Sequence, residues 1–305
     1  ITCRDWSSDV CSSDLPRWRA RLMNSFQETI RVENRRPTEA EVCEICDLIN
    51  KAFGQADYDE GYFYMTPQIF RFYCDTPHQD EAGYFMAFDT TTNKIVGYFV
   101  VGCRQYQILG HGPFKCGTPT MLAVDNNYQG KGIGKLMGTF VKNLYNNYNY
   151  FAGFQSFEDS SRGLSSVPQK NRDTFLKLKR VEQIYFRPLS MAEVLPLMSL
   201  KWYERIAIKL LQGVSPVQDS RIRDIRESDR TQIIPLLNRY TTEMDFALVW
   251  DEAYLKWYME QPNVKIKVFE ENGQIYGVLI AIILQFQIKG HLFPMASLEN
   301  YRFQE

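Results

Sequence analysis

Hydrophobic and polar positions along the chain predict the same order of secondary-structure elements twice. Apolar runs bounded by turn residues indicate strands, and apolar residues at every third or fourth position indicate helices. The first set lies at residues 29–32 (strand), 40–53 (helix), 84–88 (strand) and 94–102 (strand). The second set lies at residues 221–225 (strand), 231–240 (helix), 265–269 (strand) and 274–284 (strand). The sequence therefore predicts an internal repeat.

Turn residues separate the last two strands of each set. Asn93 lies between them in the first set, and Asn272-Gly273 lies between them in the second. Asn-Gly between apolar runs is a strong hairpin signal, because both residues accept a positive φ. We therefore expect a β-hairpin in each copy of the repeat.

The repeat divides the chain into predicted regions. Residues 28–157 form an N-terminal domain, residues 158–215 a polar loop and a connecting helix, and residues 216–305 a second, truncated domain. Residues 1–15 contain a Ser-Ser-Asp repeat and resemble translated sequencing-adapter sequence, so we expect them to be non-native or disordered. Each domain is predicted to have an α/β (α+β) fold, in which helices cover both faces of a mixed, mostly antiparallel, splayed sheet.

A glycine-rich turn between a strand and a helix is the strongest chemical motif. Residues 118–124 form a short apolar strand, residues 129–134 read Gln-Gly-Lys-Gly-Ile-Gly, and a helix is predicted to continue to about residue 145. Glycines at alternate positions allow successive backbone N–H groups to turn toward one anion, and the helix dipole adds positive potential there. The motif predicts a pyrophosphate-binding site.

Two common phosphate loops do not fit this motif. A Walker loop has Ser or Thr after Gly-Lys, whereas Leu136 follows Gly134-Lys135 here. A dinucleotide-binding fold places its glycine turn after the first strand, whereas at least three predicted strands precede this turn.

The spacing Gln-x-x-Gly-x-Gly after a strand that ends in Val124-Asp125 resembles the acetyl-CoA signature of the GNAT superfamily. The resemblance implies an acyl-CoA-dependent N-acyltransferase, with acyl-CoA as co-substrate. It implies the cofactor-binding residues Leu122, Ala123, Val124, Gln129, Gly130, Lys131, Gly132, Ile133, Gly134 and Lys135.

The resemblance also implies a bulge in the strand before the glycine turn, whose exposed backbone amides stabilise the oxyanion of acyl transfer. Met121 and Leu122 are the candidates, through their backbone N–H groups alone. The general base stays open among His78, His111, His291 and Asp125. The histidines also fit loop positions, and Asp125 could accept a proton through water or form a turn. Tyr145, Tyr148 and Tyr150 could protonate the leaving thiolate or serve in aromatic packing.

From about residue 48 to its end, the chain resembles the N-myristoyltransferases, a family of tandem GNAT proteins that acylate an N-terminal glycine. The resemblance implies a substrate-gating loop with the substrate residues Phe53, Asp57 and Phe63. Two departures are relevant: this family has basic residues where the chain has glycines, and its general base is a C-terminal carboxylate beyond the last residue here. Acetyl and myristoyl donors, peptide and small-molecule amines, and a non-catalytic binding module therefore remain alternatives.

Composition and charge narrow the classes of partner. With 35 Lys and Arg against 36 Asp and Glu, the chain lacks the overall positive charge typical of nucleic-acid binding. Its apolar runs are too short to span a bilayer, and seven cysteines without paired spacing predict neither a disulfide framework nor a metal site. We expect a cytoplasmic protein whose partner is a peptide N-terminus or a small amine.

Overall fold

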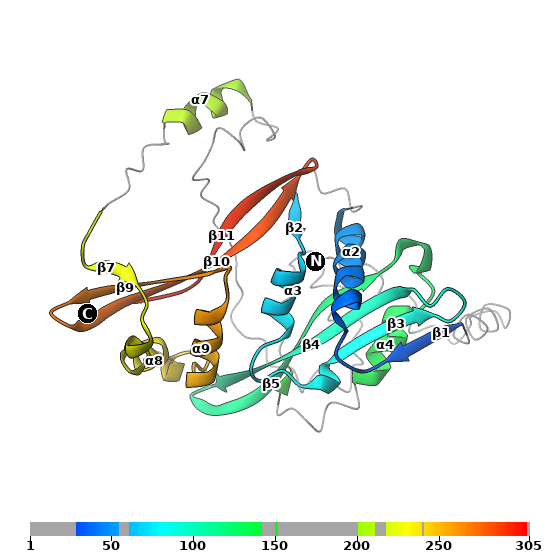
Figure 1. The fold of residues 1–305 in the computed structure, drawn as a ribbon, viewed down its shortest axis with the longest axis horizontal. Coiled ribbons are helices and arrows are strands. Elements are labelled where there is room, and N and C mark those ends of the chain that lie inside the picture. The colour runs from blue at the N-terminus through cyan, green and yellow to red at the C-terminus, as the bar shows by residue number, and fades with distance from the viewer. Residues whose placement is uncertain are drawn as a thin grey trace. The chain divides into compact units, whose positions relative to one another are not determined.

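The computed structural model describes residues 29–54, 61–141, 150–151, 201–210, 218–239 and 241–303. These residues belong to two compact units, each of which is described by itself (Figure 1). The predicted non-native segment 1–15 and most of the predicted linker 158–215 lie outside the described residues. The predicted domain boundaries therefore stay predictions.

Unit 1 contains a sheet in the order β1-β3-β4-β5-β6, with β8 pairing to β4. Every pairing is antiparallel except that of β5 with β6, which is parallel. The strands are β1 (Ile30–Glu33), β3 (Tyr84–Asp89), β4 (Ile95–Ile108), β5 (His111–Val124), β6 (Tyr150–Phe151) and β8 (Phe246–Leu248). The helices are α2 (Glu39–Gly54), α3 (Pro67–Cys74), α4 (Ile133–Val141) and α9 (Glu252–Glu260).

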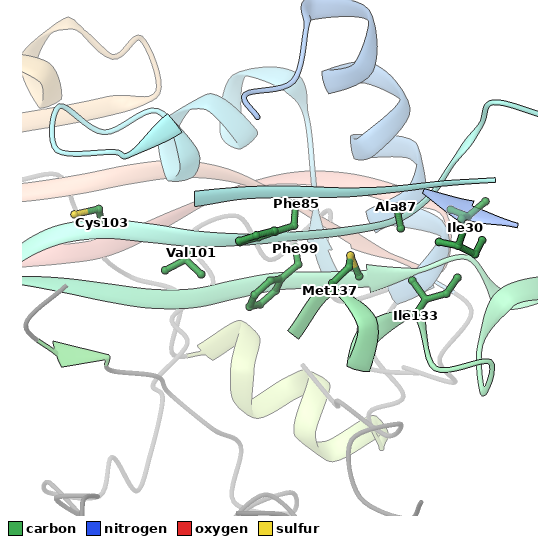
Figure 2. Close-up of a cluster of buried hydrophobic side chains, with 9 residues drawn as sticks. Ile30, Phe85, Ala87, Phe99, Val101, Cys103, Ile133 and Met137 are labelled. Atoms are coloured by element: carbon green, nitrogen blue, oxygen red, sulfur yellow. The ribbon is translucent and has the colours of Figure 1, made fainter. Parts of the chain in front are cut away.

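Helices cover both faces of this sheet. Tyr98 and Phe99 are neighbours on β4, so their side chains point to opposite faces. Tyr98 contacts Phe70 of α3 with ring centroids 5.5 Å apart, whereas Phe99 belongs to the core cluster that includes Ile133 and Met137 of α4. Figure 2 shows α4 on one side of the strands and α2 and α3 on the other. The predicted α/β class with helices on both faces is confirmed.

Local sequence explains why α2 and α3 begin where they do. Thr38 and Glu41 form a capping box before α2, in which the Thr38 N–H donates to Glu41 Oε2 at 2.7 Å. Thr66 caps α3 by accepting from the Ile69 N–H at 3.2 Å, and Pro67 occupies the first turn, where its missing N–H costs nothing. α3 ends at Cys74, and the residues that it buries are Ile69, Phe70, Phe72 and Cys74.

Unit 2 contains a second sheet, in the order β11-β10-β9-β7, with β2 pairing to β10. Its strands are β2 (Tyr62–Tyr64), β7 (Ile222–Asp224), β9 (Val264–Glu271), β10 (Gln274–Ile288) and β11 (His291–Phe303). Its helices are α7 (Trp202–Leu210) and α8 (Arg230–Asn238), although the last residue of α8 is counted with unit 1. β11 is therefore an edge strand among the described residues.

The long hairpins of the two units share their turns. Leu109 and Gly110 join β4 to β5 with φ values of 51° and 76°, and Lys289 and Gly290 join β10 to β11 with 47° and 83°. Two consecutive residues with positive φ are typical of the tight turn that suits twisted antiparallel strands. The same turn thus closes the corresponding hairpin in each unit.

The strands β4 and β10 also share a bulge, each on the side that pairs with the preceding strand of its sheet. Val96 of β4 has no partner on β3, because Ala87 pairs with Gly97 and Phe88 with Ile95. Tyr276 of β10 is likewise unpaired on β9, since Ile275 pairs with Glu270 and Gly277 with Phe269.

Each unit includes one short strand from the other half of the sequence. β8 pairs with the end of β4, where Leu248 lies opposite Tyr106, and β2 pairs with the end of β10, where Phe63 lies opposite Phe286. In unit 1, β8 pairs with residues of β4 that lie past the end of its pairing with β3. In unit 2, β2 likewise pairs with residues of β10 that lie past the end of its pairing with β9.

The predicted elements are present, but several are longer than the sequence indicates. β4 was predicted to end at residue 102 and β5 to begin at residue 118, whereas the two strands continue to a turn at Leu109-Gly110. The extension carries polar residues such as Arg104 and Gln105 and has no apolar run, so the mutual backbone pairing of the two strands specifies it. The helix α3 and the strands β2 and β8 were not predicted.

Candidate active site

The centre of β5 contains a bulge at Met121 and Leu122. Tyr98 pairs with Ala123 and Val100 with Thr120, so Met121 and Leu122 together face Phe99 alone. Met121 has φ = 55°, a left-handed conformation that is uncommon for a residue with a side chain. A bulge of this kind removes backbone groups from the ladder and redirects them. These are the two residues predicted to supply the oxyanion-binding amides.

The bulge lies beyond the part of β5 that pairs with β6. β6 pairs with β5 only at Cys116 and Gly117. Within the described part of the chain, no strand continues this pairing along residues 118–124. The predicted splay of the sheet beside the bulge stays a prediction, because the residues that follow β6 lie outside the described ones.

The glycine turn follows the bulged strand directly. Asp125 caps a short 3-10 turn (Asn126–Tyr128) by accepting from the Asn127 N–H at 2.9 Å, and Gln129 Nε2 donates to Asn126 Oδ1 at 2.6 Å. Asp125 thus has the turn-forming role that was one of its two predicted roles.

Gly130 and Gly132 have φ values of 71° and 82°. A Cβ on Gly130 would meet no atom within 4 Å, so its backbone conformation, and not space, favours glycine there. α4 begins at the next residue after Gly132, whose carbonyl accepts from the Leu136 N–H at 2.9 Å. The amides of residues 132–135 therefore lie at the start of a helix, where the dipole favours an anion.

α4 is held against the sheet by a close approach to Gly97. A Cβ at position 97 would lie 2.9 Å from Ile133 Cγ2 and 3.2 Å from Met137 Cε. Ile133 and Met137 are both buried, and Figure 2 shows them against the strands. Leu122 and Val124 pack against the same cluster. One apolar cluster thus fixes the bulged strand relative to the start of α4.

A polar network ties the glycine turn to β3. The Tyr128 hydroxyl donates to Asp89, which also accepts from the Thr91 N–H at 2.7 Å. Hydrogen bonds from Thr91 and Tyr128 hold the pKa of Asp89 well below its ordinary value, so Asp89 is a carboxylate. Lys131 Nζ lies 5.0 Å above the Tyr128 ring. Lys131 and Lys135 are exposed, so both can add positive charge at the rim of the turn.

The predicted substrate residues are not all described. Phe53 is half-buried near the end of α2 in unit 1. Phe63 lies on β2 in unit 2, is 49% exposed and contacts Phe286 edge-to-face at 5.3 Å. Asp57 lies outside the described residues. The structure brings the two predicted backbone donors together with the predicted cofactor residues, and it leaves the substrate residues as predictions.

The candidates for the general base are spread over the chain. His78 Nε2 lies 2.7 Å from Asp251 Oδ2, beside a cavity of about 410 Å³ that is also lined by Gln105 and Lys115. Lys115 is six positions from Met121 along β5, which corresponds to about 20 Å. This cavity therefore borders β5 at Lys115, away from the bulge.

The remaining histidines and tyrosines lie on strands or outside the described residues. His111 and His291 begin β5 and β11, just after the hairpin turns. Tyr150 lies on β6, and Tyr145 and Tyr148 lie outside the described residues.

One set of contacts at the bulge was not predicted. The Cys74 Sγ donates to Met121 Sδ at 3.7 Å, and the Tyr98 hydroxyl donates to Cys74 Sγ at 3.8 Å. Met121 is 7% exposed, and both partners are fully buried. No local sequence signal indicates this contact, because Cys74 and Met121 belong to distant parts of the sequence.

Known proteins share both the domain and the fold. Residues 42–150, from α2 to β6, match the acetyltransferase (GNAT) family. This match and the fold support an N-acyltransferase enzyme. None of the described helices is both long and apolar enough to cross a membrane.

The fold is similar to that of N-myristoyltransferases. A crystal structure of Saccharomyces cerevisiae N-myristoyltransferase with bound myristoyl-CoA matches with a TM-score of 0.66 at 12% identity, over 97% of this chain and 68% of that chain. A structure of the yeast enzyme with bound myristoyl-CoA and inhibitors matches with a TM-score of 0.68 at 13% identity, over 97% and 66%. The chain thus spans about two thirds of their length. No curated protein matches it in sequence.

Proposed function

We propose that the protein transfers a long-chain acyl group from acyl-CoA to the N-terminal amine of a peptide. The observation that carries the proposal is the left-handed bulge at Met121-Leu122, which leads directly into the glycine turn and α4. Oxyanion donors and a pyrophosphate cradle therefore lie on one continuous segment, as transfer from a CoA thioester requires.

In this proposal, different backbone amides bind the pyrophosphate of CoA and stabilise the oxyanion. The amides of residues 129–135 bind the pyrophosphate, and Lys131 and Lys135 add positive charge. The amides of Met121 and Leu122 donate to the thioester oxygen. As the amine nitrogen bonds to the carbonyl carbon, these donors stabilise the negative charge on that oxygen. The C–S bond then breaks, the thiolate leaves, and the proton lost by the amine balances the thiol that forms.

The proposal also specifies the length of the acyl chain that is transferred. The N-myristoyltransferase fold supports a myristoyl donor, and the yeast structures with bound myristoyl-CoA supply the precedent. A second candidate, short-chain acetyl transfer, is favoured by glycine at positions 130, 132 and 134, because this loop is that of an ordinary GNAT acetyltransferase. The matching turns of the two hairpins support a tandem arrangement of GNAT units.

Calorimetric titration with CoA, acetyl-CoA and myristoyl-CoA tests the proposal. Gly130→Val is compared with Gly273→Val, a matched control, because both glycines have positive φ and open space around the missing Cβ. Both variants carry the same backbone strain of about 1 kcal/mol, but only Gly130→Val should weaken CoA binding, by about tenfold or more.

The outcomes separate the candidates. Tight binding of myristoyl-CoA, with transfer to a glycine-starting peptide detected by mass spectrometry, supports the proposal. Equal affinity for acetyl-CoA favours the short-chain enzyme, and binding without transfer indicates a binding module. No binding of any CoA by the wild type rules out the proposed site.

A further inference from the structure

The backbone at Met121 requires support from outside β5. A left-handed conformation at a residue with a side chain costs about 1–2 kcal/mol relative to ordinary strand geometry. Such a conformation persists only where surrounding contacts determine it. The bulge is the reason for this backbone conformation, because two residues of β5 occupy the space opposite Phe99. Leu122 packs against the apolar cluster, and the contacts of the Met121 side chain add support to this backbone.

These contacts run through Cys74 to Tyr98. Methionine is unbranched and has several rotatable bonds, so burial alone does not fix it. Its thioether sulfur can only accept a hydrogen bond, and Cys74 Sγ lies 3.7 Å from it as a donor. The Tyr98 hydroxyl in turn donates to Cys74 Sγ at 3.8 Å. The three side chains form a directed chain that ends at the bulged residue.

Each donor is itself firmly held. Cys74 is the last residue of α3, and burial raises the pKa of its thiol far above the ordinary value, so the S–H donor is retained at all physiological pH values. The Tyr98 ring is fully buried and packs against Phe70 of α3 at 5.5 Å. α3 and β4 therefore fix the chain of contacts from both ends.

We propose that Cys74 and Tyr98 are positioning residues for acyl transfer: they orient the Met121 side chain and thereby keep the amides of the bulge in the geometry that receives the thioester oxygen. This inference rests on the proposed function of the bulge. Both residues are fully buried, so their removal is expected to affect the rate of transfer more than the binding of acyl-CoA.

Kinetic variants test the inference. Cys74→Ala and Tyr98→Phe should each lower kcat by about fivefold to twentyfold, with the KM for acyl-CoA changed by less than about twofold. Cys74→Ser keeps a donor and should recover part of the lost kcat. Tyr84→Phe is the matched control, because Tyr84 is also a fully buried tyrosine but its hydroxyl donates to Cys74 O and Asp75 Oδ1, not to a sulfur next to Met121. Its kcat should stay within about twofold of the wild type.

A double-mutant cycle separates positioning from general destabilisation. If Cys74 acts through Met121, Cys74→Ala combined with Met121→Leu should lower kcat no further than the stronger single variant. Additive losses, an unchanged kcat in Cys74→Ala, or an equal loss in Tyr84→Phe would each overturn the inference.

A measurement without turnover distinguishes this inference from the proposed function. In protein labelled with ¹³C at methionine methyl groups, Cys74→Ala should shift the Met121 methyl signal and the amide signals of Met121 and Leu122, whereas Tyr84→Phe should leave them in place. A wild type that binds no acyl-CoA refutes the proposed function, and the inference is refuted with it. A wild type that transfers acyl groups, in which Cys74→Ala moves neither these signals nor kcat, refutes the inference alone.

Discussion

Gly97 lies so close to Ile133 that a Cβ on Gly97 would be 2.9 Å from Ile133 Cγ2. Gly97 is on β4 and Ile133 is the first residue of α4, the helix that follows the glycine turn. The glycine therefore sets the distance between the sheet and the helix end that is proposed to bind pyrophosphate. A larger residue at position 97 moves the site as well as the core.

Gly97→Ala should destabilise the protein by about 1–3 kcal/mol and weaken CoA binding, because α4 has to move away from β4. Gly102→Ala is the control on the same strand, since a Cβ there would lie 3.6 Å from its nearest neighbour, Thr118 O, an ordinary contact. Urea unfolding and calorimetry provide the two measurements. Equal losses in the two variants would contradict the role assigned to Gly97.

The ion pair at the start of α2 predicts a stability change with pH. Arg35 donates to both carboxylate oxygens of Glu41, at 2.9 and 2.6 Å, and thereby lowers the pKa of Glu41 from 4.5 to about 2. Because the folded pKa is the lower one, the stabilisation is fully present above about pH 4.5 and is lost as the pH falls toward 2.

Wild type should therefore exceed Glu41→Gln in stability by about 1 kcal/mol near pH 7, and the difference should decrease below about pH 4.5. Chemical denaturation at several pH values measures it. In an Arg35→Met background the pH-dependent part of the difference should largely disappear. A difference that stays constant down to pH 2 would show that the ion pair contributes nothing.

Lys135 should contribute electrostatically to CoA binding. Lys135→Gln is expected to weaken CoA binding about threefold to tenfold at low salt and less at high salt, because salt screens exposed charges. Lys265→Gln, an exposed lysine on β9 of unit 2, is the control. Calorimetry at two salt concentrations checks both, and equal effects of the two variants would argue against a rim role for Lys135.

The exposed edge strand β11 should promote self-association. Leu298, Tyr301 and Phe303 on this strand are 61%, 60% and 57% exposed, and unpaired apolar edges favour strand addition by another chain. Leu298→Lys should raise the protein concentration at which light scattering first detects aggregates. Leu109→Lys changes an equally prominent leucine, 53% exposed, in a turn, and should have little effect. A monomeric wild type at high concentration would contradict this prediction.

Local patterns predicted much of the fold. The apolar stripe of α2 and the glycine turn before α4 were readable from sequence, because both depend on residues close together in the chain. The helix α3 was missed, although Thr66 followed by Pro67 is a readable helix start. That sequence was interpreted as part of a gating loop.

The geometry of the site was only partly predictable. Met121 and Leu122 were identified through the family resemblance, and no propensity indicates a left-handed methionine in a strand. The conformation depends on Phe99 across the strand pair and on Cys74 of α3. Such contacts connect residues far apart in sequence, so the pattern of neighbouring residues does not contain them.

The exchange of short strands between the two halves of the sequence has a consequence for synthesis on the ribosome. The edge of β4 that β8 covers stays unpaired until residues 246–248 have been made. The stacking of Phe72 on Trp257, at 5.0 Å, also waits for α9. Unit 1 therefore cannot complete its fold while the first half of the chain emerges, and we expect the nascent chain to expose an apolar strand edge for most of its translation.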